Sequence, residues 1–174
     1  MTVDELLAMP EDGMRRELVA GELREMTPVG RPHARTHQRI NRSLDAHVLE
    51  RGLGEVYSEY GYVLESEPAT VRAPDLSFVR TDRLGESSDQ GYFVGVPDLA
   101  IEIVSPNDRL SEVRAKVKEY LDAGTPMVIV ADPQNRDVLV YRSGGAPLEL
   151  SGTDIIDGGD VVPGWRLPVR DIFG

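Results

Sequence analysis

The chain has 174 residues, of which 40% are hydrophobic and 28% are charged, values that are ordinary for a soluble globular protein. It contains no cysteine, which excludes disulfides and thiolate metal sites and is compatible with a cytoplasmic location. The net charge of -11 argues against a broad basic surface for nucleic acid, because phosphate neutralisation dominates duplex binding.

The length favours a single domain over residues 1–174, large enough to bury its own core. No apolar run approaches the roughly 20 residues that a membrane-spanning helix needs. The acidic N-terminal segment also lacks the pattern of a signal peptide. We therefore expect no membrane partner.

A short helix and a hairpin are predicted at the start of the chain. Thr2 and Glu5 have the spacing of a capping box for a helix that ends near Leu7. The pattern over residues 17–26 is typical of a β-hairpin. Its first residue, Glu17, is interpreted as an exposed strand carboxylate.

The clearest amphipathic helix is predicted over residues 33–49. His33 and His37 stand one turn apart, but no cysteine and no third ligand at a characteristic distance accompany them, so zinc is not predicted. We place His33 at the start of the helix or at the mouth of a site. A local basic patch fits one face of this helix, with solvation or pairing with acids as the alternative; its residues are Arg31, Arg35, Arg39 and Arg42.

A strand is predicted from Val56 to Leu64, after glycines that end the long helix. Glu59 lies on this strand, and the alternation does not decide which way its side chain points. Because oxygen ligands suit Mg²⁺, Glu59 is a secondary candidate for a metal site.

Two strands that carry acids are predicted next, around residues 76–79 and 99–104. If the second strand returns antiparallel to the first, the start of one lies opposite the end of the other, which brings Asp75 towards Glu102. Asp98 then lies about 13 Å from Glu102, too far to share an ion. We therefore expect Asp75 and Glu102 to be ligands and keep Asp98 as a secondary candidate.

Glu102 interrupts a strand that is otherwise apolar on both faces. Period-two alternation places it on one face with Ala100 and Val104. A buried carboxylate needs a cation, hydrogen-bond donors or a metal. The alternative to a metal ligand is a carboxylate satisfied by backbone donors or an arginine.

A helix capped by Asp108 is predicted to follow. Lys116 lies on its apolar stripe near Tyr120, an unusual place for a lysine. This position would be explained if the Lys116 ammonium reached the Glu102 end of the sheet, where it could pair with carboxylates or a phosphate. The alternative is an ordinary lysine whose stem packs while its charge stays in water.

The last third of the chain predicts further strands. The run Met127–Val130 is apolar throughout and should be buried in the sheet. Shorter strands are predicted around residues 138–141, 148–150 and 161–167, and Trp165 is interpreted as core packing or a subunit contact.

The order of these motifs resembles the Uma-two (Uma2) family of restriction-endonuclease-like proteins, which lies within the wider PD-(D/E)xK nuclease fold. The motifs are Pro74-Asp75, the run Pro97 to Pro106, and Lys116 four residues before Tyr120. Shorter matches extend the resemblance over nearly the whole chain. It implies an α/β (α+β mixed) fold with a restriction-endonuclease-like core, in which helices flank a central mixed β-sheet and extra β-hairpins are added.

The resemblance also implies metal-dependent endonuclease activity on nucleic acid, with DNA as the expected substrate. Asp75 and Glu102, with the main-chain carbonyl of Ile103, would hold Mg²⁺ or Mn²⁺. The common signature places its lysine where this chain has Val104, so the resemblance assigns that role to Lys116, which would orient the water or neutralise the phosphate.

Two further positions belong to the same pattern. The resemblance implies a recurring acid at Glu17, and it includes Tyr120 as a secondary candidate.

A homodimer is expected because cutting both strands of a duplex needs two sites. The alternatives are a nuclease fold that only binds or regulates, and a hydrolase of small phosphoesters, because a fold by itself does not fix a function.

Overall fold

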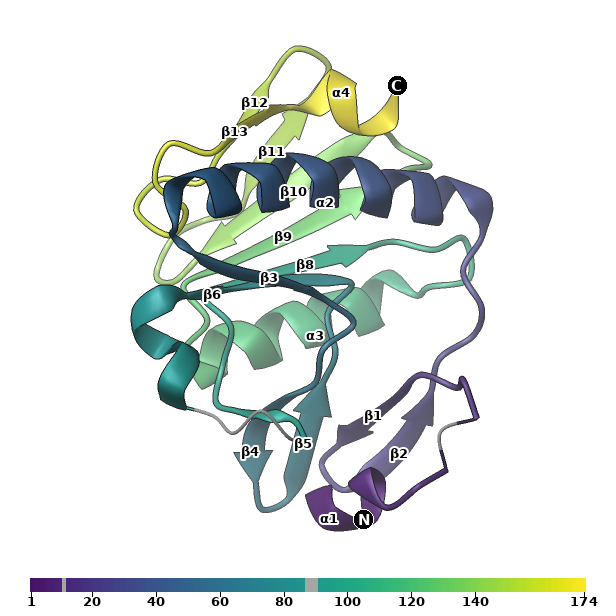
Figure 1. The fold of residues 1–174 in the computed structure, drawn as a ribbon. Coiled ribbons are helices and arrows are strands. Elements are labelled where there is room, and N and C mark those ends of the chain that lie inside the picture. The colour runs from purple at the N-terminus through teal and green to yellow at the C-terminus, as the bar shows by residue number, and fades with distance from the viewer. Residues whose placement is uncertain (11, 87–90) are drawn as a thin grey trace.

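The computed structural model describes residues 1–10, 12–86 and 91–174, and a mixed β-sheet lies at its centre (Figure 1). The sheet has six strands in the order β11-β10-β9-β8-β6-β3. Strands β8 and β9 are parallel, and the other neighbours are antiparallel. The strands are β3 (Gly54–Ser58), β6 (Leu76–Arg80), β8 (Leu99–Ile103), β9 (Met127–Asp132), β10 (Asp137–Arg142) and β11 (Leu148–Ser151).

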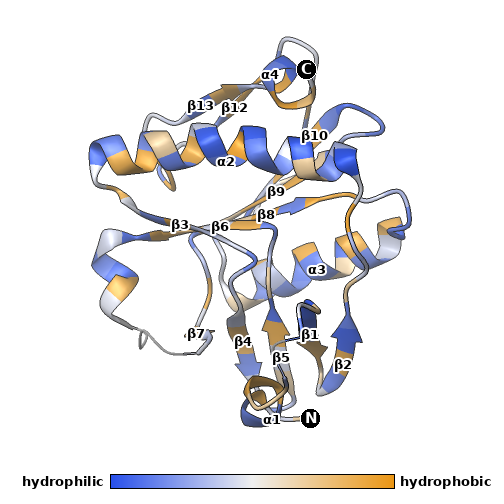
Figure 2. Cartoon of the chain, turned by 45° about the vertical axis from the view of Figure 1, so that its right-hand side comes forward, coloured by the Kyte–Doolittle hydropathy of each residue, from blue (hydrophilic) through white to orange (hydrophobic). Residues whose placement is uncertain are grey.

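Two long helices cover opposite faces of this sheet, α2 (Arg31–Arg51) and α3 (Leu110–Ala123). Alternation along β8 explains the arrangement. Leu99, Ile101 and Ile103 belong to the core cluster under α2, whereas Ala100 packs with residues of α3. In Figure 2 the central strands are mainly hydrophobic, while both helices mix hydrophobic and hydrophilic segments, as amphipathic helices do.

The predicted long helix is confirmed and is longer by two residues at each end. It stops at Gly52, whose φ of 62° is the left-handed conformation common after a helix. The predicted cap of α3 is wrong. Arg109 occupies the N-cap position, and Asp108 instead accepts a hydrogen bond from the Ser105 N–H at 2.7 Å, within the preceding turn.

A second sheet, in the order β2-β1-β5-β4-β7, lies beside the first. Its strands are β1 (Arg16–Val19), β2 (Glu22–Glu25), β4 (Tyr62–Ser66), β5 (Ala69–Arg72) and β7 (Phe93–Val94). The predicted N-terminal hairpin is confirmed, with φ of 49° at Ala20 and 79° at Gly21, the signs that a tight hairpin turn requires. The helix α1 (Val3–Leu7) with its capping box is also present as predicted, and the structure adds that it packs on this sheet.

The single strand predicted from Val56 to Leu64 is wrong, because the chain changes sheets within it. It leaves β3 after Ser58, adopts a φ of 55° at Glu59, and enters β4 at Tyr62. The 3₁₀ helix η1 (Thr81–Glu86) follows β6.

The C-terminal segment closes one edge of the main core with β12 (Ile155–Asp157), β13 (Arg166–Pro168) and α4 (Val169–Phe173). The strand predicted over 161–167 is therefore present only at its end. Trp165 is buried, as predicted, and its Nε1 donates to Ser43 Oγ of α2 at 3.1 Å. Within the described ranges, no helix has the length and apolar character to cross a bilayer.

Candidate active site

The antiparallel return predicted for the two acid-bearing strands is confirmed. Leu76 of β6 pairs with Ile101 of β8. One step further along the same register, Asp75 comes opposite Glu102, so their side chains share a face of the sheet. The face is the one covered by α3, since Ala100 packs there.

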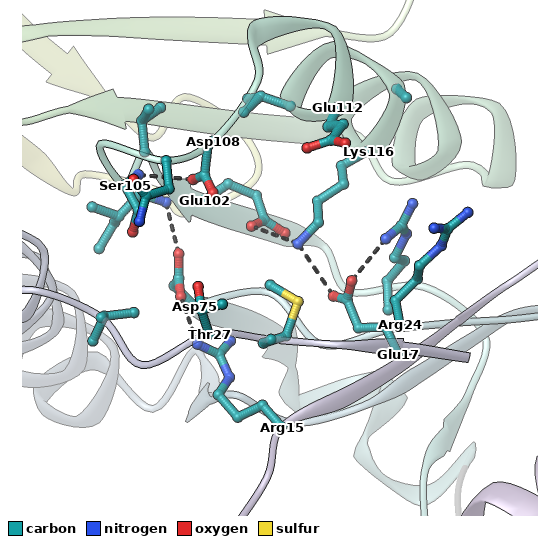
Figure 3. A pocket seen from close by; sticks show the side chains of 18 of the residues that line it. Arg15, Glu17, Arg24, Thr27, Asp75, Glu102, Ser105, Asp108, Glu112 and Lys116 are labelled. Atoms are coloured by element: carbon teal, nitrogen blue, oxygen red, sulfur yellow. Dashed lines mark hydrogen bonds and ion pairs between the residues drawn. The ribbon is translucent and has the colours of Figure 1, made fainter. Parts of the chain in front are cut away.

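A cleft of about 510 Å³ lies over these two carboxylates (Figure 3). The β1–β2 hairpin and the segment after it form one wall, and the start of α3 with the turn before it forms the other. Residues of both sheets and of α3 therefore meet here; those used below are Arg15, Glu17, His33, Arg72, Asp75, Glu102, Ile103 and Lys116.

Asp75 is buried and is held by protein donors. Its Oδ2 accepts the Ile103 N–H at 2.7 Å and lies 3.2 Å from His33 Nε2, while its Oδ1 accepts from Arg15 at 3.3 Å. Burial alone would raise the pKa of Asp75, but His33, the Ile103 N–H and Arg15 outweigh burial and lower it. Asp75 is thus an anion at neutral pH, and His33, at the first turn of α2, is buried against it.

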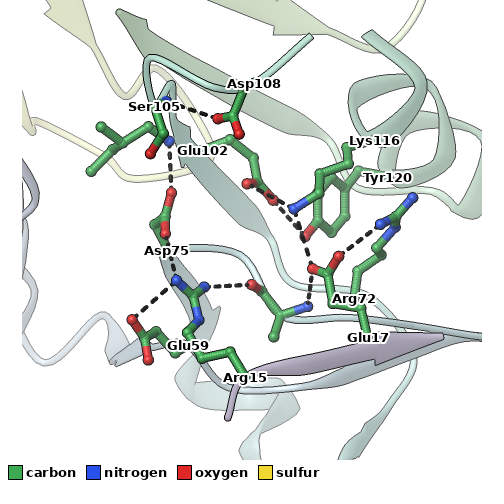
Figure 4. A network of polar contacts seen from close by, with 12 residues as sticks. Arg15, Glu17, Glu59, Arg72, Asp75, Glu102, Ser105, Asp108, Lys116 and Tyr120 are labelled. Atoms are coloured by element: carbon green, nitrogen blue, oxygen red, sulfur yellow. Dashed lines mark hydrogen bonds and ion pairs between the residues drawn. The ribbon is translucent and has the colours of Figure 1, made fainter. Parts of the chain in front are cut away.

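Glu102 binds two residues of α3. Lys116 Nζ lies 3.4 Å from its Oε2, and the Tyr120 hydroxyl donates to its Oε1 at 3.0 Å (Figure 4). Burial raises the pKa of Glu102 to about 7, helped by the charges of Asp75 and Glu17 and opposed by Lys116. The predicted reach of Lys116 to the Glu102 end of the sheet is confirmed.

The interpretation of Glu17 as an exposed carboxylate is wrong, because its side chain points into the cleft and Glu17 is only 1% exposed. It accepts from Arg72 at 2.7 Å, from the Ala73 N–H at 3.1 Å and from Lys116 at 3.3 Å. Burial opposes ionisation of Glu17, but Lys116 and Arg72 outweigh burial and lower its pKa. Lys116 therefore sits between two carboxylates.

Sequence reasoning missed Arg72, which is 5% exposed at the end of β5. It bridges Glu17 and Glu119, the latter at 2.6 Å. The available signal is its place two residues before the Pro74-Asp75 motif, but its partners are distant in the sequence. Arg15 was missed for the same reason.

Two secondary candidates are not brought to the cleft. Glu59 lies beyond the end of β3, with a side chain 46% exposed and 3.2 Å from Arg15. Asp98 is buried at the opposite end of β8, where it accepts the Arg80 N–H at 3.0 Å and pairs with Arg83 at 3.1 Å. Asp98 thus stabilises the turn between β6 and η1 through its contacts with Arg80 and Arg83.

The predicted basic patch also lies outside the cleft. Three of its arginines are exposed on α2, namely Arg31, Arg35 and Arg42. The fourth, Arg39, donates to the carbonyl of Ile172 at 3.3 Å. None of the four lines the cleft.

The donors fit a hard divalent cation in part. Within the ranges that the structure describes, no three His, Cys, Asp or Glu side chains form a group that could hold a metal. Asp75 and Glu102 supply carboxylate oxygens. The Ile103 N–H points at Asp75. In a strand the carbonyl of a residue points to the same side as its N–H, so the Ile103 carbonyl is directed to the β6 side of β8 as well. Such an all-oxygen set suits Mg²⁺, which usually retains several waters.

The family model of Uma2, described as putative restriction endonuclease, matches residues 3–170. The fold is similar to the crystal structure of a putative nuclease belonging to DUF820 from Anabaena variabilis, with a TM-score of 0.87, 21% sequence identity, and coverage of 99% of this chain and 97% of that chain. No curated protein matches the sequence. The structural likeness confirms the predicted restriction-endonuclease-like fold, and the family match, which spans nearly the whole sequence, shows that the chain belongs to the Uma2 family.

Proposed function

We propose that the protein is a metal-dependent endonuclease that hydrolyses phosphodiester bonds in nucleic acid, with DNA as the expected substrate. The observation that carries this proposal is the convergence of Asp75, Glu102 and Lys116 in one cleft, from β6, β8 and α3. Membership of the Uma2 family supports it.

In this proposal Asp75, Glu102 and the Ile103 carbonyl hold Mg²⁺ or Mn²⁺. When bound, the ion would lower the pKa of a coordinated water and stabilise the charge that develops on the phosphate. Asp75 is prepared for this role as an anion fixed by the Ile103 N–H. Tyr120 positions Glu102 by its hydrogen bond to Oε1.

Lys116 would orient the attacking water or neutralise the scissile phosphate. Burial favours its neutral form, but the charges of Glu102 and Glu17 outweigh burial and raise the pKa of Lys116. The ammonium is therefore charged in the cleft at neutral pH. Preorganised charge of this kind is effective because it needs no reorientation during the reaction.

Replacing Lys116 with methionine is expected to slow Mn²⁺-dependent DNA cleavage about 100-fold, because one preorganised donor is lost. Wild-type cleavage should stop when EDTA removes the metal, and Mn²⁺ binding by Lys116→Met should persist in calorimetry. The matched control is Lys118→Met, whose side chain is 75% exposed on the same helix. Undiminished cleavage by Lys116→Met would remove the residue from the site. Wild-type activity confined to small phosphoesters would favour that alternative function.

Metal affinity is expected to depend on pH through Glu102. Its pKa of about 7 means that the side chain carries a proton below neutral pH, and the ion must displace that proton. Mn²⁺ affinity should therefore fall about tenfold for each pH unit below 7 and level off above it. Calorimetry over this range in two buffers measures the affinity and the proton released. A constant affinity across pH 7 would contradict the role of Glu102.

A further inference from the structure

Arg15 connects the cleft to an exposed acid outside it. It directly precedes β1, and its carbonyl accepts the Met26 N–H at 2.9 Å, which fixes its backbone to the hairpin. Its side chain crosses to Asp75 and Glu59 (Figure 4). One nitrogen, Nη1, serves both carboxylates, at 3.3 Å from Asp75 and 3.2 Å from Glu59.

The two carboxylate oxygens of Asp75 have different partners. The Ile103 N–H holds Oδ2 at 2.7 Å, and His33 lies beside the same oxygen. Among the described residues, Oδ1 has Arg15 as its hydrogen-bond partner and no other. Because Oδ2 is engaged by the backbone, Oδ1 is the oxygen through which Asp75 would bind a cation. Arg15 already occupies it.

From this geometry we propose that Arg15 competes with the divalent cation for Asp75 Oδ1. When the cation binds, Arg15 leaves Asp75 and stays paired with Glu59. The inference rests on the metal site of the proposed function. Two positive charges on one carboxylate oxygen repel each other, so the guanidinium must give way before the ion is bound at full strength.

Arg15 is held loosely enough to move. Its contacts with Asp75, Glu59 and the Ala73 carbonyl measure 3.2 to 3.3 Å. Charge-assisted hydrogen bonds are usually about 2.7–2.9 Å. Its Nε is buried without a hydrogen-bond partner among the described residues, so the observed position leaves one donor unsatisfied. Glu59 is half exposed and already within contact distance, so a small displacement suffices.

The same arrangement occurs at the other proposed ligand. Lys116 divides its ammonium between Glu102 at 3.4 Å and Glu17 at 3.3 Å. Each of the two proposed carboxylate ligands thus shares its protein cation with a second acid that is not a ligand. The second acid allows the cation to leave the ligand without becoming unpaired in a partly buried site.

Calorimetric titration of Mn²⁺ tests the competition directly. Arg15→Gln is expected to bind Mn²⁺ about tenfold more tightly than wild type, because the competing charge is gone. Glu59→Gln should bind about threefold more weakly, because Arg15 loses its alternative partner. In the double variant the Glu59→Gln effect should disappear, since Glu59 acts only through Arg15.

The matched controls are Arg166→Gln and Asp157→Asn, which break an exposed 3.7 Å pair outside the cleft and should leave Mn²⁺ affinity unchanged. The inference is overturned if Glu102-dependent Mn²⁺ binding is present but Arg15→Gln binds no more tightly and Glu59→Gln no more weakly. The half-exposed Glu59 variant keeps the test valid if Arg15→Gln folds poorly. If neither wild type nor Arg15→Gln binds Mn²⁺, the proposed metal site itself is wrong.

Discussion

Replacing Glu102 with glutamine is expected to abolish calorimetric Mn²⁺ binding and to slow metal-dependent cleavage at least about 1000-fold. Glutamine has nearly the same shape and keeps an oxygen for the Tyr120 hydroxyl, which donates at 3.0 Å. What is lost is the negative charge that would hold the ion. Single-turnover cleavage assays with excess enzyme, together with the titration, measure both losses.

The fold should tolerate this substitution. Burial raises the pKa of Glu102 to about 7, so the native structure already accommodates the uncharged form of this side chain near neutral pH. The matched control is Glu112→Gln, an exposed residue of α3 that lines the same cleft. If Glu102→Gln binds Mn²⁺ as wild type does while the control is also normal, Glu102 is not a ligand.

Replacing Arg72 with methionine is expected to lower the free energy of unfolding by about 3 to 5 kcal/mol, because it removes one partner from a buried ion pair. Arg72 is 5% exposed and contacts Glu17 at 2.7 Å and Glu119 at 2.6 Å. Glu17, with 1% exposure, would keep only Lys116 and the Ala73 N–H. Urea unfolding monitored by circular dichroism gives the change in midpoint and slope.

A double variant separates the loss of the pair from a loss of packing. Arg72→Met combined with Glu17→Met removes the buried carboxylate together with its partner, and Glu119, which also loses Arg72, has a side chain 28% exposed to water. The double variant should therefore recover most of the stability, because apolar replacements of buried ion pairs are often neutral. Arg24→Met, at a 58% exposed side chain, should change stability by no more than about 0.5 kcal/mol. A loss below about 1 kcal/mol for Arg72→Met would show that water screens the pair.

The part of the site that the sequence predicts depends on short-range patterns. Period-two alternation, the intervals between the strands and the stripe of α3 suffice to bring Asp75, Glu102 and Lys116 together. The prediction also requires that the two acid-bearing strands run antiparallel, and the pairing of β6 with β8 agrees with this. The helix α2 is likewise predicted within two residues at each end, because its apolar stripe is continuous.

The remaining residues of the site depend on contacts that no local pattern encodes. Glu17 and Arg72 are 55 positions apart, and Arg15 and Asp75 are 60 apart. In β1 both Glu17 and Leu18 are buried, so alternation does not separate an inner from an outer face. The sequence pattern also does not reveal the change of sheets at Glu59. Residues typical of strands stand on both sides of Glu59, while the backbone there leaves β3 and enters β4.

The placement of the hairpin ties the chemistry to a small cooperative unit. Leu18 of β1 packs in a satellite cluster with β4, β5 and α1, separate from the main core under α2. Local opening of such a unit requires less free energy than global unfolding. Detachment of the hairpin would withdraw Glu17 from Lys116 and Arg15 from Asp75 while leaving the six-stranded sheet folded. The structure therefore places both proposed carboxylate ligands at the six-stranded sheet, whereas Glu17 and Arg15, which adjust the charge around them, belong to a hairpin segment that packs in the smaller cluster.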